Sequence, residues 1–260
     1  MKTSWKEKSI ADDFEDYNDV LEESLGFRFI FECLNKSGID TILDYGCGPG
    51  KVAFRLAQNH KKEIIAVDES KEMIQIACQK RSHDLVGYHL IQNDNLSFLD
   101  DDSVDGAIIC YVFINTADET RIKRIMAEIH RVLKPGGNIL ILDTNPNSIG
   151  IPFSTFQNGK TGKTYGYGEP RQEWLNLPNN EKLVLHDFHW PDSMYKYLLS
   201  EVGFCIINQM EPTLHDIPLE EIPELDNKFQ QSKLKNEWNY PPFVIFNAQK
   251  ARVNSNGRYI

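Results

Sequence analysis

Short apolar runs alternate with amphipathic stretches over the first half of this chain, and this alternation restricts the possible folds more than any other feature. We predict strands at five apolar runs, residues 41–44, 63–68, 89–92, 104–112 and 138–143. Helices are predicted between them, at residues 51–59, 71–80 and 117–133. Strands that alternate with amphipathic helices form a mainly parallel sheet that helices cover on both faces. The sequence therefore predicts a doubly wound α/β fold.

The flanking segments show other patterns. The stretch after residue 144 is rich in glycine and aromatic residues, and its runs 173–177 and 182–188 can pair as a hairpin. A long segment without regular alternation is typical of a lid or a binding element. A helix at 192–202 and strands at 204–210 and 242–250 follow. We predict a single domain with three parts: an N-terminal helical segment at 1–40, a core at 41–144 and 191–250, and a substrate cap at 145–190.

Charge and cysteine content argue against several classes of protein. Thirty-eight acidic and 28 basic side chains give a net charge of −10, which disfavours nucleic acid as a partner because phosphate binding needs clustered Lys and Arg. The five cysteines are scattered and form no Cys-x-x-Cys pair, which predicts neither a disulfide framework nor a metal site. The longest apolar run, residues 107–114, is far shorter than the roughly 20 residues that cross a membrane. We expect a cytoplasmic protein with no membrane partner; the sequence leaves its oligomeric state open.

A glycine-rich turn follows the first predicted strand. It reads Asp-Tyr-Gly-Cys-Gly-Pro-Gly over residues 44–50, and Asp68 ends the second strand. Glycine lets the backbone turn tightly and approach a ligand, and the following helix offers free N–H groups. A carboxylate after the second strand suits a pair of ribose hydroxyls. A dinucleotide fingerprint would need glycine where Lys51 stands. These features predict a nucleoside-type ligand without a pyrophosphate.

Five motifs follow one another along the first half of the chain. They are the glycine turn at 44–50, Asp-Glu-Ser-x-x-Met at 68–73, Gln-Asn-Asp at 92–94, the strand at 104–111, and the Glu-x-x-Arg-Val-Leu-Lys-Pro-Gly-Gly stretch at 128–137. In this order they resemble the motifs of the class I S-adenosylmethionine-dependent methyltransferases. The resemblance implies a seven-stranded sheet whose last strand is antiparallel, S-adenosylmethionine as cofactor and S-adenosylhomocysteine as product. Glu69 departs from the pattern, since the family more often has an apolar residue beside the adenine.

The resemblance also assigns contacts to the cofactor. Asp68 would bind the ribose hydroxyls, Asp94 the adenine amino group, and Met73 the adenine face. Tyr17 and Arg28 would reach the cofactor's carboxylate. The full set of predicted cofactor-binding residues is Tyr17, Arg28, Asp44, Gly46, Gly48, Gly50, Asp68, Met73, Asp94, Asn95 and Tyr111.

Candidates for a catalytic base are few. His186 and His189 lie in a His-Asp-Phe-His-Trp stretch, and imidazole titrates near neutral pH, so we select them as candidates. The alternatives are structural histidines or two ligands of a metal site, and a site of two histidines without a third ligand is poorly supported. We therefore predict no metal.

The predicted function is methyl transfer from S-adenosylmethionine to an oxygen or nitrogen atom of a small molecule, by in-line displacement in a capped aromatic pocket. The chain lacks the Asn/Asp-Pro-Pro-Tyr run that amino-methylating nucleic-acid enzymes carry after the fourth strand. Two alternatives stay open from the residues alone. One is an NAD(P)-dependent oxidoreductase on the same type of sheet, and the other is a non-catalytic S-adenosylmethionine-binding protein.

Overall fold

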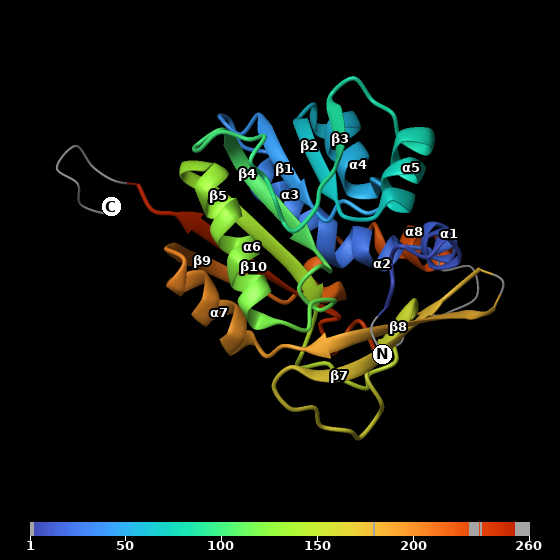
Figure 1. Cartoon of the computed structure of the whole chain (residues 1–260). Coiled ribbons are helices and arrows are strands. Elements are labelled where there is room, and N and C mark those ends of the chain that lie inside the picture. Colours follow the sequence, from blue (N-terminus) through green and yellow to red (C-terminus); the bar gives the residue numbers. More distant parts are fainter. Residues whose placement is uncertain (1–2, 179, 229–233, 235, 253–260) are drawn as a thin grey trace.

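The computed structural model describes residues 3–178, 180–228, 234 and 236–252. Its main feature is a seven-stranded sheet with the order β3-β2-β1-β4-β5-β10-β9 (Figure 1). Strands β3, β2, β1, β4 and β5 are parallel neighbours, and β10 is antiparallel to both β5 and β9. The strands are β1 (Thr41–Tyr45), β2 (Glu63–Asp68), β3 (Val86–Leu90), β4 (Val104–Cys110), β5 (Leu133–Thr144), β9 (Phe204–Met210) and β10 (Phe243–Lys250). The predicted sheet, with its antiparallel last strand, is confirmed.

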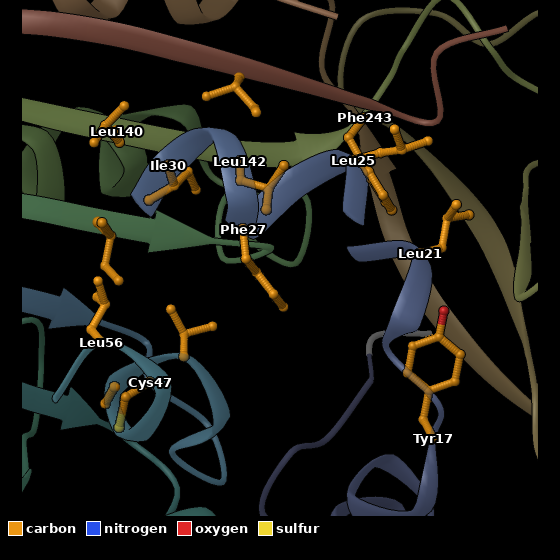
Figure 2. Close-up of a cluster of buried hydrophobic side chains, with 14 of the residues drawn as sticks. Tyr17, Leu21, Leu25, Phe27, Ile30, Cys47, Leu56, Leu140, Leu142 and Phe243 are labelled. Atoms are coloured by element: carbon orange, nitrogen blue, oxygen red, sulfur yellow. The ribbon is translucent and has the colours of Figure 1, made fainter. Parts of the chain in front are cut away.

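Helices cover both faces of this sheet because successive strand residues point to opposite sides. On one face, Leu140 and Leu142 of β5 pack with the N-terminal helices and α4, as Figure 2 shows in part. On the other face, Ile139 and Ile141 of the same strand pack with α6 and α7. The helices of the core are α3 (Arg28–Leu34), α4 (Lys51–His60), α5 (Lys71–Lys80), α6 (Glu119–Val132) and α7 (Asp192–Glu201).

The N-terminal segment, predicted to be helical over residues 1–40, consists of several short helical pieces. Helix α1 (Lys8–Asp16) ends before Tyr17, and α2 (Val20–Glu22) continues into a π-helical turn, η1 (Glu23–Phe27), that leads into α3. At Gly26 a Cβ atom would lie 2.9 Å from Leu142 Cδ2, so a larger residue there would push the turn away from β5. Two short elements occur late in the chain, η2 (Leu214–Asp216) and α8 (Ile222–Lys228).

A second, smaller sheet has the order β6-β7-β8 and is antiparallel throughout. Its strands are β6 (Phe156–Asn158), β7 (Glu169–Asn176) and β8 (Lys182–His189). The predicted hairpin is therefore longer than expected and has a third strand. Among the described residues, no helix is both long and apolar enough to cross a membrane.

Candidate functional site

A cavity of about 630 Å³ lies where the ends of β1, β2 and β4 meet the second sheet and the N-terminal segment. From the large sheet it is lined by residues 44–49, 68–70 and 110–112, all at the carboxyl ends of parallel strands. From the second sheet, residues 173, 175, 185 and 187 line it. Ligands of open α/β sheets bind outside the carboxyl ends of the strands, so this is the expected position for a site.

The turn after β1 is shaped by glycines that adopt left-handed backbone angles. The backbone N–H groups of Gly46 and Cys47 both donate to the carbonyl of Val67, at 2.8 and 2.9 Å, which folds the turn tightly against β2. Gly46 has a φ of +78°, and a Cβ atom there would overlap Val112 Cγ2. Gly48 has a φ of +52° and nothing within 4 Å of the position of a Cβ, so it leaves open space beside the cavity.

Asp68 is held in place by the backbone around it. One carboxylate oxygen accepts from Gly48 N–H at 2.8 Å, and the other accepts from Ser70 N–H at 2.7 Å. Each oxygen keeps a further lone pair for a ligand hydroxyl. Burial raises the pKa of Asp68. The arrangement presents a pre-oriented acceptor pair at the cavity, which fits the two hydroxyls of a ribose.

Asp44 lies below this turn and is 2% exposed. Within the described residues its Oδ2 has no hydrogen-bond partner, although the residue lines the cavity. Burial, with the nearby charge of Asp68, raises the pKa of Asp44 to about 7. A buried carboxyl oxygen without a partner is unfavourable in the protein alone, so Asp44 is suited to receive a donor from a ligand.

The N-terminal segment crosses the cavity and is fixed at three points. Trp5 donates its indole N–H to Asn115 Oδ1 at 3.1 Å, and its carbonyl accepts from the Ser70 hydroxyl at 2.7 Å. The backbone N–H of His186 donates to the Thr3 hydroxyl at 2.6 Å. This segment therefore contacts the loop after β4, the start of α5 and the second sheet at once.

The end of the cavity at the second sheet contains three buried carboxyl groups. Glu22, Glu173 and Asp187 are 6%, 5% and 1% exposed. Glu22 accepts a hydrogen bond from the Tyr17 hydroxyl at 2.6 Å, and burial raises its pKa to about 8. Burial also raises the pKa values of Glu173 and Asp187, and the charge of Asp187 raises that of Glu173 further.

Tyr111 also lines the cavity. It follows β4 and has a φ of +59°, a conformation that is costly for a residue with a side chain. Its hydroxyl is buried and has no hydrogen-bond partner among the described residues, while its ring packs edge-on against Phe243. Backbone strain of this kind occurs at active sites and ligand contacts, which fits the position of Tyr111 on the cavity.

The predicted cofactor-binding residues divide into two groups. Those that line the cavity are Tyr17, Asp44, Gly46, Gly48, Asp68, Met73 and Tyr111. The others have partners elsewhere. Arg28 forms ion pairs with Glu221 at 2.6 Å and Glu32 at 3.3 Å, and Gly50 stands at the N-cap of α4, where a Cβ would meet Tyr88.

The turn predicted to hold the adenine is also engaged with protein groups. Asp94 accepts from the guanidinium groups of Arg121 and Arg124, both at 2.6 Å, and from the Tyr45 hydroxyl at 3.0 Å. Although burial opposes it, these arginines hold the pKa of Asp94 below its ordinary value. Asn95 is exposed and accepts from Ser97 N–H at 2.7 Å. Their roles toward a cofactor stay predictions.

The two histidines selected as catalytic candidates do not line the cavity. On β8, Leu185 and Asp187 do line it, and His186 between them points to the opposite side, as strand alternation requires. His189 lies farther along the strand, with its ring 6.2 Å from that of Tyr165, and burial lowers its pKa. A catalytic role for either histidine stays a prediction.

Sequence reasoning missed Trp5, Glu22, Glu173 and Asp187. For the two strand acids a signal existed. In β8 the inward positions read Leu183, Leu185 and Asp187, so strict alternation places an acid on the apolar face of the strand. Glu22 gave no such signal, because it faces the cavity only where the helix passes into the π-helical turn.

The fold and the cavity together define an α/β protein that holds a nucleoside-type cofactor above the ends of parallel strands. Comparisons with known proteins extend this. A methyltransferase domain model matches residues 42–137. The chain is 32% identical over 229 residues to N-demethylindolmycin N-methyltransferase from Streptomyces griseus, which covers 86% of this chain and 92% of that one. It is 25% identical over 211 residues to a demethylmenaquinone methyltransferase from Staphylococcus epidermidis, with 76% and 82% covered.

A solved structure agrees in fold. The crystal structure of an S-adenosylmethionine-dependent methyltransferase from Mesorhizobium loti superposes with a TM-score of 0.59 at 19% identity, covering 88% of this chain and 99% of that one. The chain belongs to the S-adenosylmethionine-dependent methyltransferases, and S-adenosylmethionine is its cofactor. It is therefore a methyltransferase and not a nicotinamide-dependent oxidoreductase.

Proposed function

We propose that this enzyme transfers a methyl group to an oxygen or nitrogen atom of a small molecule that binds under the second sheet. The observation that carries the proposal is the continuity of the cavity. One space joins the glycine turn and Asp68 to a wall made by Glu173, Leu175, Leu185 and Asp187. A small acceptor on that wall would face a cofactor on the turn, and confinement of two reactants in one geometry contributes on the order of 7–11 kcal/mol to catalysis.

The residues that would hold the cofactor are those at the strand ends. Asp68 would accept from the ribose hydroxyls with its two oriented oxygens. The open backbone at Gly48 would allow the cofactor's amino-acid portion close to the turn, and Asp44 would accept from a donor there. When bound, S-adenosylmethionine supplies an activated methyl group on a sulfonium. The protein's part is to orient the acceptor and to exclude water.

Residues 145–190 would form the substrate cap. Their strands β7 and β8 form the wall of the cavity opposite the glycine turn. A hydrogen bond from His186 N–H to the Thr3 hydroxyl connects β8 to the N-terminal segment. The relatives' names support a small acceptor: one is named for N-demethylindolmycin and the other for demethylmenaquinone.

A labelled-methyl experiment tests this function. Purified enzyme with methyl-labelled S-adenosylmethionine is incubated with three fractions of a bacterial extract: small molecules, protein and nucleic acid. We expect label in the small-molecule fraction alone. Label confined to protein or nucleic acid would overturn the proposal, and label in no fraction would favour a non-catalytic cofactor-binding protein.

A further inference from the structure

The acceptor end of the cavity has a charge pattern that the methyl-transfer function does not by itself require. Glu22 of α2, Glu173 of β7 and Asp187 of β8 converge there from three separate parts of the chain. On β7 and β8 only alternate residues line the cavity, which shows that the side-chain faces of these strands form the wall. We call these three residues the carboxyl cluster.

The carboxyl cluster receives few hydrogen bonds within the described residues; one is the bond from the Tyr17 hydroxyl to Glu22. Glu173 and Asp187 share a hydrogen bond with each other. No other group of the described residues donates to Glu22 Oε2, Glu173 Oε2 or the two Asp187 carboxyl oxygens, all of which are buried.

One nearby cation is Arg171, which donates to the carbonyl of Phe188 and to the Thr144 hydroxyl. Lys51 also borders the cavity, but it donates to the carbonyls of Phe14 and Tyr17. The charge of Arg171 acts on Glu173 and Asp187, and that of Lys51 acts on Glu22. Three carboxyl groups therefore have two cations near them, and the hydrogen bonds of both cations go to other groups.

A ligand can supply the missing hydrogen bonds. Buried acceptors without donors are unfavourable, and a buried negative charge needs a positive partner. An ammonium group brings three N–H donors and a positive charge, a hydroxyl brings one donor and no charge, and a carboxylate would be repelled. Beside the cluster, Phe27, Leu175 and Leu185 offer apolar surface to a carbon skeleton.

We propose that the methyl acceptor is a small amine, or a comparable basic nitrogen compound with an apolar body, held and methylated at the nitrogen beside Glu22, Glu173 and Asp187. This inference rests on the proposed function and narrows its acceptor. The raised pKa values of these groups agree with it, because burial disfavours the charged form of a carboxyl group that has no close cation.

The proton balance is simple. A bound ammonium gives one proton to a carboxylate of the cluster and becomes a neutral amine. The nitrogen lone pair then forms a bond to the methyl carbon while the carbon–sulfur bond breaks, its electron pair remaining on sulfur. The product is the N-methylated ammonium, which again has a positive charge beside the cluster, and S-adenosylhomocysteine leaves neutral at sulfur.

Thermal melting in the presence of S-adenosylhomocysteine tests the amine site without turnover. The probes are benzylamine and phenethylamine, with benzyl alcohol and benzoate as matched neutral and anionic compounds. At ten times its dissociation constant, an amine should raise Tm by roughly 3–5 °C, and the other two should have little effect. Failure of both amines to raise Tm would overturn the inference.

Variants locate the site. In Glu173→Gln and Asp187→Asn, tested separately, the amine-induced shift should be lost while the affinity for S-adenosylhomocysteine stays within about twofold. Glu22→Gln is a third variant in case one of the strand variants does not fold. Glu181→Gln, an exposed acid at the turn of the same hairpin, is the matched control. A tenfold loss of S-adenosylhomocysteine affinity with an intact amine shift would mean that the cluster binds the cofactor's own amino group, and the inference would be wrong.

Methyl transfer to the same compounds separates the two proposals. We expect label in the amines, and in Asp187→Asn a fall of about 100-fold in kcat/KM for them, as is usual when one partner of a buried charge pair is removed. Label in benzyl alcohol alone would overturn the amine inference and leave the proposed function intact. Label only in protein or nucleic acid would overturn the proposed function itself.

Discussion

The two ends of the cavity are built in opposite ways. At the cofactor end, a short stretch of chain from Asp44 to Met73 supplies the turn, the acid and the helix start, and backbone N–H groups already satisfy both oxygens of Asp68. At the acceptor end, side chains from three distant segments meet, and several of their oxygens have no partner among the described residues. A cofactor shared by many enzymes is held by local backbone geometry, whereas the selection of an acceptor depends on side chains that only the complete fold brings together.

The largest effect is expected at Asp68, where the cofactor end depends on one side chain. Asp68→Ala removes a charged acceptor of two ribose hydroxyls, and hydrogen bonds to a charged group contribute about 1.5–3 kcal/mol each. We expect S-adenosylhomocysteine to bind at least about 100-fold more weakly in calorimetry. Glu63→Ala, at the other end of β2, is the control. An unchanged affinity in Asp68→Ala would remove the ribose assignment.

Paired glycine variants separate the two functions of the turn. In Gly46→Ala the new side chain requires a strained left-handed backbone and also overlaps Val112. We therefore expect a loss of about 3 kcal/mol in the free energy of unfolding. Gly48→Ala meets the backbone cost alone, about 1 kcal/mol, but places a methyl group beside the cofactor. Urea denaturation should rank Gly46→Ala as less stable, and calorimetry should show a clear loss of cofactor affinity in Gly48→Ala. Equal stability of the two variants would contradict the packing at Val112.

The buried Glu22 at the acceptor end should make the free energy of unfolding depend on pH. Burial raises the pKa of Glu22 from 4.5 to about 8, so between these values the folded protein binds more protons than the unfolded chain. The free energy of unfolding therefore falls as pH rises through this window, by about 1 kcal/mol per pH unit from this group. Glu22→Gln removes this titration, so from pH 5.5 to 7.5 the variant should gain about 2 kcal/mol relative to wild type. Glu32→Gln, at an exposed glutamate on α3, controls for the loss of a charge. If the difference in unfolding free energy between Glu22→Gln and wild type stays constant over this pH range, the raised pKa of Glu22 is wrong.

The smallest effect is expected at His189, which lies in the second sheet but not on the cavity. We expect His189→Ala to keep kcat within about threefold of wild type. By comparison, Asp187→Asn is expected to lose about 100-fold in kcat/KM for amines. Melting of both variants checks that they are folded. A loss of kcat in His189→Ala with unchanged cofactor affinity would restore His189 as the catalytic base.

The fold was predictable where one short stretch of sequence decides the structure. The alternation of strands and helices fixed the order and type of the core elements, and the glycine turn with Asp68 located the cofactor end. Strand β3 was placed three residues late because it is a partly exposed edge strand and its apolar pattern is weak. Arg28 and Asp94 show most clearly what sequence patterns cannot predict. Arg28 pairs with Glu221, and Asp94 pairs with Arg121 and Arg124. These ion pairs depend on packing between distant segments, about which the periodicity of the sequence gives no information.

The position of β10 has a consequence for how the protein is made. Residues 243–250 form this strand, yet it lies between β5 and β9, and its side chains enter both hydrophobic cores. Every other strand of the sheet emerges from the ribosome before it. Until β10 is synthesised, β5 and β9 each present an unpaired edge, which is the kind of surface that invites wrong pairing between chains. A ribosome that stalls shortly before residue 243 would therefore hold a nascent chain whose sheet is still open between β5 and β9.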